Sequence, residues 1–249
     1  MTARPGSSNE FCWMDLKTRD LPGTAAFFAD TLGWRFAVDE EDWRRAVKIT
    51  ADGGHRIGGV SDLAHPVYPP GTPAHIAFYL AVDDLDRRTA TAVAHGARLV
   101  VPPFDAGDQG RMATLVDPAG AAVSLWQPHR FGGWEFPPGS SGTPHRMVLA
   151  CEQPDRAREF YREITGGTAF ARADFTTAVT TPGAAPQWEL VVGVDDLATV
   201  AARVHEAARA RAGDHGRARA VWPNDPDRSV LRLTSPEGLT VRLIQHGAQ

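Results

Sequence analysis

Hydrophobic and polar residues alternate near the start of the chain in a pattern that predicts a strand followed by a helix. Positions Phe11–Lys17 alternate and predict a strand. A helix is expected from a cap at Asp20 or Thr24 to about Leu32, where Gly33 provides a stop signal. The segments expected next are three short strands and a Pro- and Gly-rich loop: Trp34–Val38, Ala46–Thr50, His55–Val60 and then His65–Pro73.

The same order of elements follows again directly. Ala74–Val82 predicts a strand, and Asp83 or Asp84 can cap a helix that runs to about His95, before Gly96. The strands expected after this helix are Arg98–Val101, Arg111–Asp117 and Ala121–Gln127. The first half of the chain is therefore interpreted as two βαβββ segments.

The second half repeats this order. Its expected elements are a strand over Arg146–Cys151, a helix over Asp155–Ile164, short strands as far as Thr180, a strand over Gln187–Val194, a helix over Leu197–Ala212, and strands near Arg217–Trp222, Ser229–Thr234 and Thr240–Gln245. Because the strands come in runs of three, four such segments indicate an α+β fold and exclude a doubly wound parallel sheet.

Three sequence matches in the same order indicate an internal duplication. The matched pairs are Ala81–Leu85 with Gly193–Leu197, Asp117–Gly120 with Ser235–Gly238, and Phe27–Phe28 with Phe160–Tyr161. The stretch between the copies is rich in Gly, Pro and Ser, which is typical of a linker. Its aromatic residues Phe131, Trp134 and Phe136 indicate that it packs against the rest of the chain. We therefore expect domains at 1–128 and 145–249, joined by a linker at 129–144.

Composition narrows the possible partners and compartment. The formal charge of −4 over 249 residues gives no basic surface for nucleic acid, and no apolar run is long enough to cross a membrane. Residues 1–9 lack the apolar core of a secretory signal. Two cysteines, Cys12 and Cys151, cannot build a disulfide framework, which favours a reducing, cytoplasmic environment. A monomer or a homodimer is expected.

Three segments resemble the vicinal oxygen chelate superfamily of glyoxalases, bleomycin-resistance proteins and extradiol dioxygenases. They are Asp20–Trp34 (DLPGTAAFFADTLGW), His75–Asp86 (HIAFYLAVDDLD) and Gly110–Pro128 (GRMATLVDPAGAAVSLWQP). The resemblance is strong over Phe11–Pro128 and weaker in the second half. It implies tandem glyoxalase-like domains, each made of two βαβββ units that form a half-open barrel around a cavity.

Enzymes of this superfamily usually hold a divalent metal with His, Gln or Glu side chains, yet the matching positions here lack them. In the first half these positions are Trp13, Ala77, Ser124 and a position near Gly58, none of them a good ligand for a divalent metal. The equivalent positions of the second half are Arg146, Glu189 and Arg242. Two guanidinium groups around a carboxylate would repel a cation and favour a buried ion cluster, with a further carboxylate or a bound anion nearby. We therefore expect no metal and no cofactor.

Aromatic residues on the expected inward strand faces are the main ligand-binding candidates. Trp13, Tyr79 and Trp126 could stack on an aromatic or polycyclic ligand, although ordinary core packing would explain the same residues. Ser124 lies on the last strand of the same half and completes this group.

Three polar residues are further candidates. His75 could act as a general base or ligate a metal at a shifted position, or it could be an inert, hydrogen-bonded histidine. Asp15 shares a strand face with Trp13 and could meet a ligand, act as a base, or pair with Lys17 in a structural salt bridge. Arg111 could bind a carbonyl or carboxylate of a ligand, or brace the acidic loop Asp105–Asp108.

The leading hypothesis is a metal-free protein that binds an aromatic or polycyclic small molecule. Such a protein would serve as a sequestering resistance protein or as an accessory enzyme of specialised metabolism. Two alternatives remain open: a metal-dependent lyase, isomerase or dioxygenase, and a cofactor-free enzyme that uses His75 or Asp15 as a base on a phenolic substrate. The fold alone cannot distinguish them, because one fold hosts many chemistries.

Overall fold

The computed structural model describes residues 9–40, 42, 45–167, 172–178, 185–210, 218–223 and 228–246. Its helices are α1 (Leu21–Leu32), α2 (Leu85–Ala94), α3 (Pro154–Ile164) and α4 (Leu197–Ala210), with a short 3₁₀ turn, η1, at Asp52–Gly54. None of the helices in these described ranges is long and apolar enough to span a membrane.

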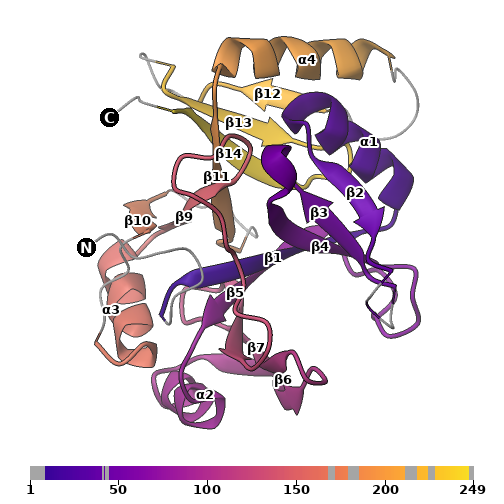
Figure 1. Ribbon diagram of the computed structural model, residues 1–249. Helices are drawn as coiled ribbons and strands as arrows, with labels where there is room; N and C mark the ends of the chain where they lie inside the picture. The colour runs from indigo at the N-terminus through magenta and orange to yellow at the C-terminus, as the bar shows by residue number, and fades with distance from the viewer. Residues whose placement is uncertain are drawn as a thin grey trace. The chain divides into compact units, whose positions relative to one another are not determined.

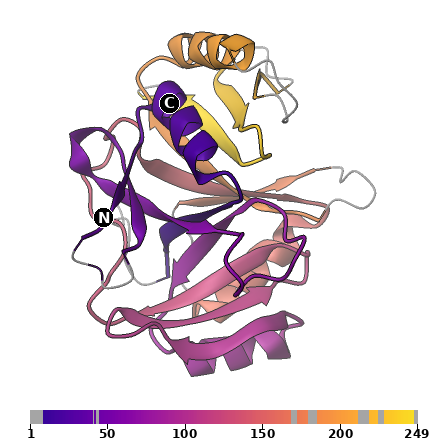
Figure 2. The ribbon, with the colours of Figure 1, turned by 90° about the vertical axis from the view of Figure 1, so that its right-hand side faces the viewer.

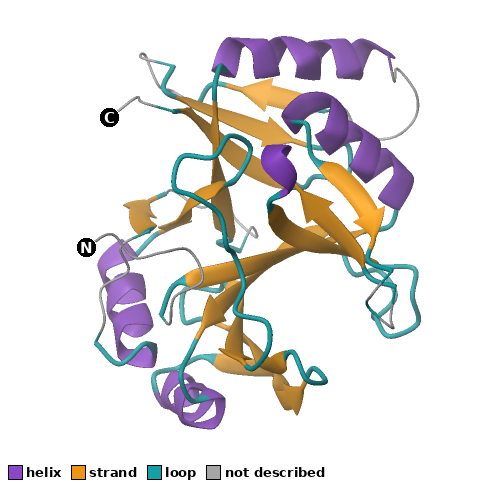
Figure 3. Cartoon of the chain, in the orientation of Figure 1, coloured by secondary structure: helices purple, strands orange, loops and turns teal. Residues whose placement is uncertain are grey.

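The strands form two sheets (Figures 1 and 3). Those of the first half are β1 (Phe11–Thr18), β2 (Arg35–Val38), β3 (Val47–Thr50), β4 (Arg56–Asp62), β5 (His75–Ala81), β6 (Arg98–Asp105), β7 (Gly110–Val116) and β8 (Ala122–Pro128). Those of the second half are β9 (Pro144–Cys151), β10 (Ala173–Thr177), β11 (Trp188–Val194), β12 (Arg219–Val221), β13 (Val230–Thr234) and β14 (Thr240–Gln245). The first set pairs in the order β2-β3-β4-β1-β5-β8-β7-β6 and the second in the order β10-β9-β11-β14-β13-β12.

The predicted α+β class and order of elements are confirmed, with one difference. The first, second and fourth segments each show the βαβββ order, and within each of them the first and last strands are parallel neighbours. In the third segment the described residues contain β9, α3 and β10 only. Of the short strands predicted there, β10 lies in the described residues, and the rest of that prediction falls on 168–171 and 179–180, outside them.

The chain packs as two compact units, each of which takes one segment from each half. Unit 1 comprises residues 1–13, 77–135 and 146–189, and unit 2 comprises 14–76, 136–145 and 190–249. In unit 1, α2 packs against β6, β7, β8 and α3 (Figure 2). In unit 2, α1 packs against α4 and β2. The division of the sequence at 128 and 144 stays a prediction.

Helix α1 begins and ends at the signals that the sequence carries. The Asp20 carboxylate accepts the Gly23 N–H at 2.9 Å and so caps the first turn. Gly33 adopts φ 71° at the other end and donates its N–H to the Ala29 carbonyl at 3.0 Å. Between these caps, Phe27 and Phe28 are fully buried, and Phe28 stacks on Trp34 at 5.0 Å.

The segment between the two halves is packed, as its aromatic residues predict. Trp134 is buried and donates its backbone N–H to the Cys12 carbonyl at 2.8 Å. Gly133, at φ 104°, lies so close to Cys12 that a side chain would collide with the Cys12 backbone. Phe136 is also buried and faces the His55 ring at 6.1 Å.

The duplicated turns of the two halves share one hydrogen-bond pattern. Asp117 and Ser235 each donate a backbone N–H to the carbonyl four residues later, at 2.8 Å in both turns. Each also accepts the N–H of that same later residue on its side chain, at 2.8 Å from Ala121 and 3.1 Å from Leu239. The duplication seen in the sequence therefore extends to the geometry of these turns.

Candidate ligand-binding site

Unit 1 brings the predicted aromatic residues together. The Tyr79 and Trp126 rings meet edge to face at 6.3 Å, and Phe131 approaches Trp13 at 4.8 Å and Trp126 at 6.1 Å. The surrounding small and apolar side chains are Cys12, Ala81, Ala106 and Met112. We call Trp13, Tyr79, Trp126 and Phe131 the aromatic cluster. The first three residues pack together, and the expectation that they line one cavity and bind a ligand stays a prediction.

Backbone contacts hold the Trp126 indole in place. Its Nε1–H donates to the Phe131 carbonyl at 3.0 Å. Gly110 lies against the ring, where an added Cβ would come within 2.5 Å of Cζ2. Trp13 and Tyr79 are only partly buried, so part of their surface remains accessible. Phe131 was not predicted as a site residue, although its aromatic character in a polar linker was the available signal.

Unit 2 contains a polar group around Lys17. Its ammonium donates to the Asp15 carboxylate, to Ser61 Oγ at 2.9 Å and to Tyr68 Oη at 3.1 Å. Ser61 in turn donates to Asp15 Oδ2 at 2.6 Å. The structural pairing of Asp15 with Lys17 is therefore present, and contact of Asp15 with a ligand stays a prediction. Parallel register between β1 and β4 places Ser61 beside Lys17, a relationship that is not visible from spacing in the sequence.

His75 and Ser124 each form a hydrogen bond with a nearby residue. His75 Nδ1 lies 2.8 Å from the Pro73 carbonyl. Ser124 is buried, and its hydroxyl bonds with that of Thr114 at 2.8 Å. Both contacts are those expected of structural residues, and the functional roles of the two side chains stay predictions.

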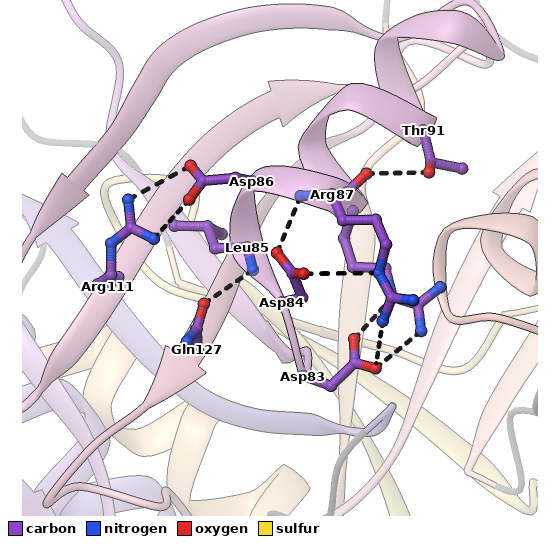
Figure 4. Close-up of polar contacts among 9 residues, drawn as sticks. Asp83, Asp84, Leu85, Asp86, Arg87, Thr91, Arg111 and Gln127 are labelled. Carbon is purple, nitrogen blue, oxygen red and sulfur yellow. Dashed lines mark hydrogen bonds and ion pairs between the residues drawn. The ribbon is translucent and has the colours of Figure 1, made fainter.

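Arg111 makes the contacts expected of a brace for the acidic loop, and its contact with a ligand stays a prediction. Figure 4 shows its pairing with Asp86. Its guanidinium contacts Asp86 at 2.7 Å and Asp105 of the acidic loop at 3.0 Å. The hydrogen bond from Arg111 lowers the pKa of Asp86, and the same bond raises the pKa of Arg111. The neighbour of Arg111 across the sheet, Gln127, accepts the Leu85 N–H at 2.8 Å, so the two side chains together hold the start of α2.

Arg146, one of the residues expected in the ion cluster of the second half, has a carboxylate partner. Arg146 contacts Asp174 at 2.9 Å, and the side chains are 41% and 42% exposed. Asp174 therefore supplies a carboxylate beside Arg146, while the buried cluster that would require this carboxylate stays a prediction. The convergence of Glu189 and Arg242 with Arg146 stays a prediction. At this exposure an ion pair contributes about 0–1 kcal/mol, well below the range for a buried cluster.

Residues 12–125 match the family described as the Glyoxalase/Bleomycin resistance protein/Dioxygenase superfamily. This part of the chain belongs to that superfamily. It is 33% identical over 166 residues to the putative glyoxylase CFP32 of Mycobacterium tuberculosis, a match covering 66% of this chain and 62% of that protein. It therefore spans less than two thirds of that relative. It is also 29% identical over 206 residues to the anthracycline biosynthesis protein DauV of Streptomyces sp. strain C5, covering 76% of this chain and 72% of the relative.

Solved structures of the superfamily share the fold. A Mn(II)-bound glyoxalase from Novosphingobium aromaticivorans aligns with a TM-score of 0.57 at 15% identity, covering 96% of this chain and 82% of that one. A catechol 2,3-dioxygenase aligns with a TM-score of 0.56 at 15% identity, covering 97% and 90%. At these identities the comparison supports the tandem glyoxalase-like architecture alone.

The superfamily implies a divalent metal, and the donor chemistry at the matching positions does not suit one. Trp13 packs against Phe131, Ala77 has only a methyl group, and the Ser124 hydroxyl is bonded to Thr114. Divalent metals in proteins are held by carboxylate, carbonyl, imidazole or thiolate groups, and an indole or a methyl side chain supplies none of these. Within the described ranges, no group of three or more His, Cys, Asp or Glu side chains converges. No step of the proposed function is therefore assigned to a metal.

Proposed function

We propose that this chain binds a planar aromatic or polycyclic small molecule against the aromatic cluster of unit 1, without a divalent metal. The observation that carries the proposal is the convergence of Trp13, Tyr79, Trp126 and Phe131 around small side chains, with two of the rings partly accessible. Aromatic rings held edge to face offer flat surfaces onto which another ring can stack.

Relatives support the same chemical class. Two proteins similar to this chain are named for anthracycline biosynthesis, and anthracyclines are polycyclic aromatic compounds. The proposed role is that of a sequestering resistance protein or an accessory enzyme of specialised metabolism in a cytoplasmic setting. Recovery of the bound molecule unchanged supports the first role, and a chemically altered product supports the second.

The binding test uses anthraquinone-2-sulfonate as a planar probe, measured by calorimetry and by quenching of tryptophan fluorescence. Trp13→Ala and Trp126→Ala are each expected to weaken binding by about 1–3 kcal/mol, the scale for removing an aromatic anchor. Trp222→Ala is the matched control, because Trp222 belongs to unit 2 and packs against Arg228 at 5.7 Å. Unchanged affinity in folded Trp13→Ala and Trp126→Ala proteins would contradict the proposal.

The metal-free part of the proposal is tested by elemental analysis of the purified protein. We expect no stoichiometric zinc, iron, nickel or manganese. About one such ion per chain, lost in the His75→Ala variant, would instead support a metal-dependent lyase, isomerase or dioxygenase.

A further inference from the structure

Unit 1 contains a cavity of about 540 Å³ beside the start of α3. On the helix side it is lined by Cys151, Glu152, Gln153 and Ala157, and on the opposite side by Pro118 and Ala119 of the turn between β7 and β8. These residues belong to none of the groups described above, so the cavity has no role in the aromatic-ligand proposal.

The internal duplication indicates which chemical group this cavity binds, because unit 2 contains an equivalent position. The turn at Ser235–Gly238 is the counterpart of the turn at Asp117–Gly120, and it shares its hydrogen bonds. Helix α1 is likewise the counterpart of α3, because the aromatic pair Phe27–Phe28 matches Phe160–Tyr161. The start of α1 in unit 2 is therefore the equivalent of the cavity wall in unit 1.

In unit 2 the equivalent space is filled by the Glu237 carboxylate. It accepts the backbone N–H groups of Arg19 at 3.2 Å and Asp20 at 3.3 Å. It also accepts the hydroxyls of Thr18 and Thr24, the latter at 3.2 Å. A carboxylate here satisfies donors that precede the helix and lies at the positive end of its dipole.

In unit 1 the position of Glu237 is occupied by Ala119, whose side chain ends at a methyl group. The counterparts of the four residues that bind Glu237 are the four that line the helix side of the cavity. Gln153, at the N-cap of α3, accepts the Arg156 guanidinium on its side-chain oxygen at 2.8 Å and makes no side-chain bond to the backbone of the first turn, whereas Asp20 caps α1. The lining of the cavity therefore includes the counterparts of all the residues around the Glu237 carboxylate, and Ala119 brings no carboxylate of its own.

The lining of the cavity carries charges of both signs. Arg156 and His95 line it together with the start of the helix. Of the glutamates in the lining, Glu152 precedes the helix, whereas Glu159 and Glu163 lie farther along it and contact Arg162 at 2.7 and 3.8 Å. At 1.5 Å per residue, Glu163 is about 15 Å along the axis from Gln153. Apolar surface from Ala157, Phe160 and Pro186 lies in the same lining.

We propose that this cavity is a second small-molecule site, which binds an organic acid with its carboxylate at the start of α3, in the place of Glu237, and its apolar body along Ala157 and Phe160. The inference rests on the duplicated geometry and does not depend on the aromatic-ligand proposal.

The first test compares sodium hexanoate with hexylamine, two probes of similar length and opposite charge, by saturation-transfer NMR on the full chain. Hexanoate is expected to bind saturably and hexylamine is not. Ala119→Glu should place a carboxylate in the cavity and weaken hexanoate binding by at least about tenfold. Trp13→Ala should leave hexanoate binding unchanged, which separates this site from the aromatic cluster.

The second test needs no ligand. Ala119→Glu and Ala119→Gln fill the cavity with side chains of nearly equal size, so they differ in charge alone. The Glu variant is expected to unfold at a higher urea concentration than the Gln variant. Equal or stronger binding of hexylamine, hexanoate binding that survives Ala119→Glu, or a Gln variant as stable as the Glu variant would each overturn the proposal.

Discussion

The Tyr161 hydroxyl donates a hydrogen bond to Asp117 Oδ2 at 2.9 Å, and both groups are buried in unit 1. The same oxygen of Tyr161 accepts the indole N–H of Trp188 at 2.8 Å. Asp117 belongs to the turn after β7, whereas Tyr161 lies on α3 in the other half of the sequence. A contact of this kind joins the two segments of unit 1 through polar groups that water does not reach.

Replacing Tyr161 with Phe removes a single oxygen atom, yet it is expected to destabilise the protein strongly. The variant removes one donor from the buried Asp117 carboxylate and leaves the buried indole N–H of Trp188 without its acceptor. The cost should be about 1–3 kcal/mol for the unsatisfied groups, measured as the loss in free energy of unfolding in urea. Trp222→Phe, at a less buried position of unit 2, is the control and should cost less. A Tyr161→Phe protein of unaltered stability would show that these bonds contribute nothing.

Asp117 should make stability depend on pH in the direction opposite to that of most carboxylates. Burial raises the pKa of Asp117 in the folded protein, despite hydrogen bonds from Ala121 and Tyr161 that lower it. A raised folded pKa means that the contribution of Asp117 is fully present below the unfolded pKa of about 3.9 and is lost as pH rises through the folded value. The free energy of unfolding of the wild type, minus that of Asp117→Asn, should therefore fall between acidic and neutral pH. A difference that is constant or rises over this range would contradict the assignment.

The fold was largely predictable, because its signals are local. Caps at Asp20 and Asp84, the glycine stop at Gly33 and period-two alternation in the strands each act over a few residues. The matched turns at Asp117 and Ser235 likewise revealed the duplication. What the sequence did not reveal is which segments form a compact unit, since each unit takes residues from both halves.

The candidate sites were predictable to a lesser extent. Alternation on a strand places Trp13, Tyr79 and Trp126 on particular faces, and this was enough to bring them together. Phe131 reaches the same cluster through a linker, and Ser61 and Tyr68 reach Lys17 through strand register and a loop. Contacts between residues so far apart in sequence depend on tertiary packing, which the spacing of residues along the chain does not reveal.

The pKa of the Asp83 carboxyl is expected to be unusually low because of the neighbouring Arg88. The hydrogen bond from Arg88 lowers the pKa of Asp83 to about 2, with a smaller effect from the charge of Arg87. Carbonyl NMR titration of Arg88→Gln should move this pKa most of the way back toward about 3.9, the unperturbed value for Asp. Arg87→Gln is the matched control and should move it less. The Asp83 carboxylate is 47% exposed, so its contribution to stability should not exceed about 1 kcal/mol. This contribution is present above the unfolded pKa and is lost as pH falls through the folded pKa. An equal shift in the two variants would contradict the assignment to Arg88.

Glu237 is expected to stabilise unit 2 by binding the start of α1. Its carboxylate accepts the N–H groups of Arg19 and Asp20 and the hydroxyls of Thr18 and Thr24, so Glu237→Ala leaves several donors without this acceptor. Removal of such an interaction should lower the free energy of unfolding by about 0.5–2 kcal/mol, the scale for a helix cap. Glu237→Gln retains the shape and loses the charge, so it should lie between the wild type and the Ala variant. Glu206→Ala, at an exposed position of α4, is the control and should change stability by less than about 0.5 kcal/mol. If Glu237→Ala were as stable as Glu206→Ala, the Glu237 carboxylate would not be stabilising the start of α1. The proposal that the equivalent cavity beside α3 binds a carboxylate would then lose its support.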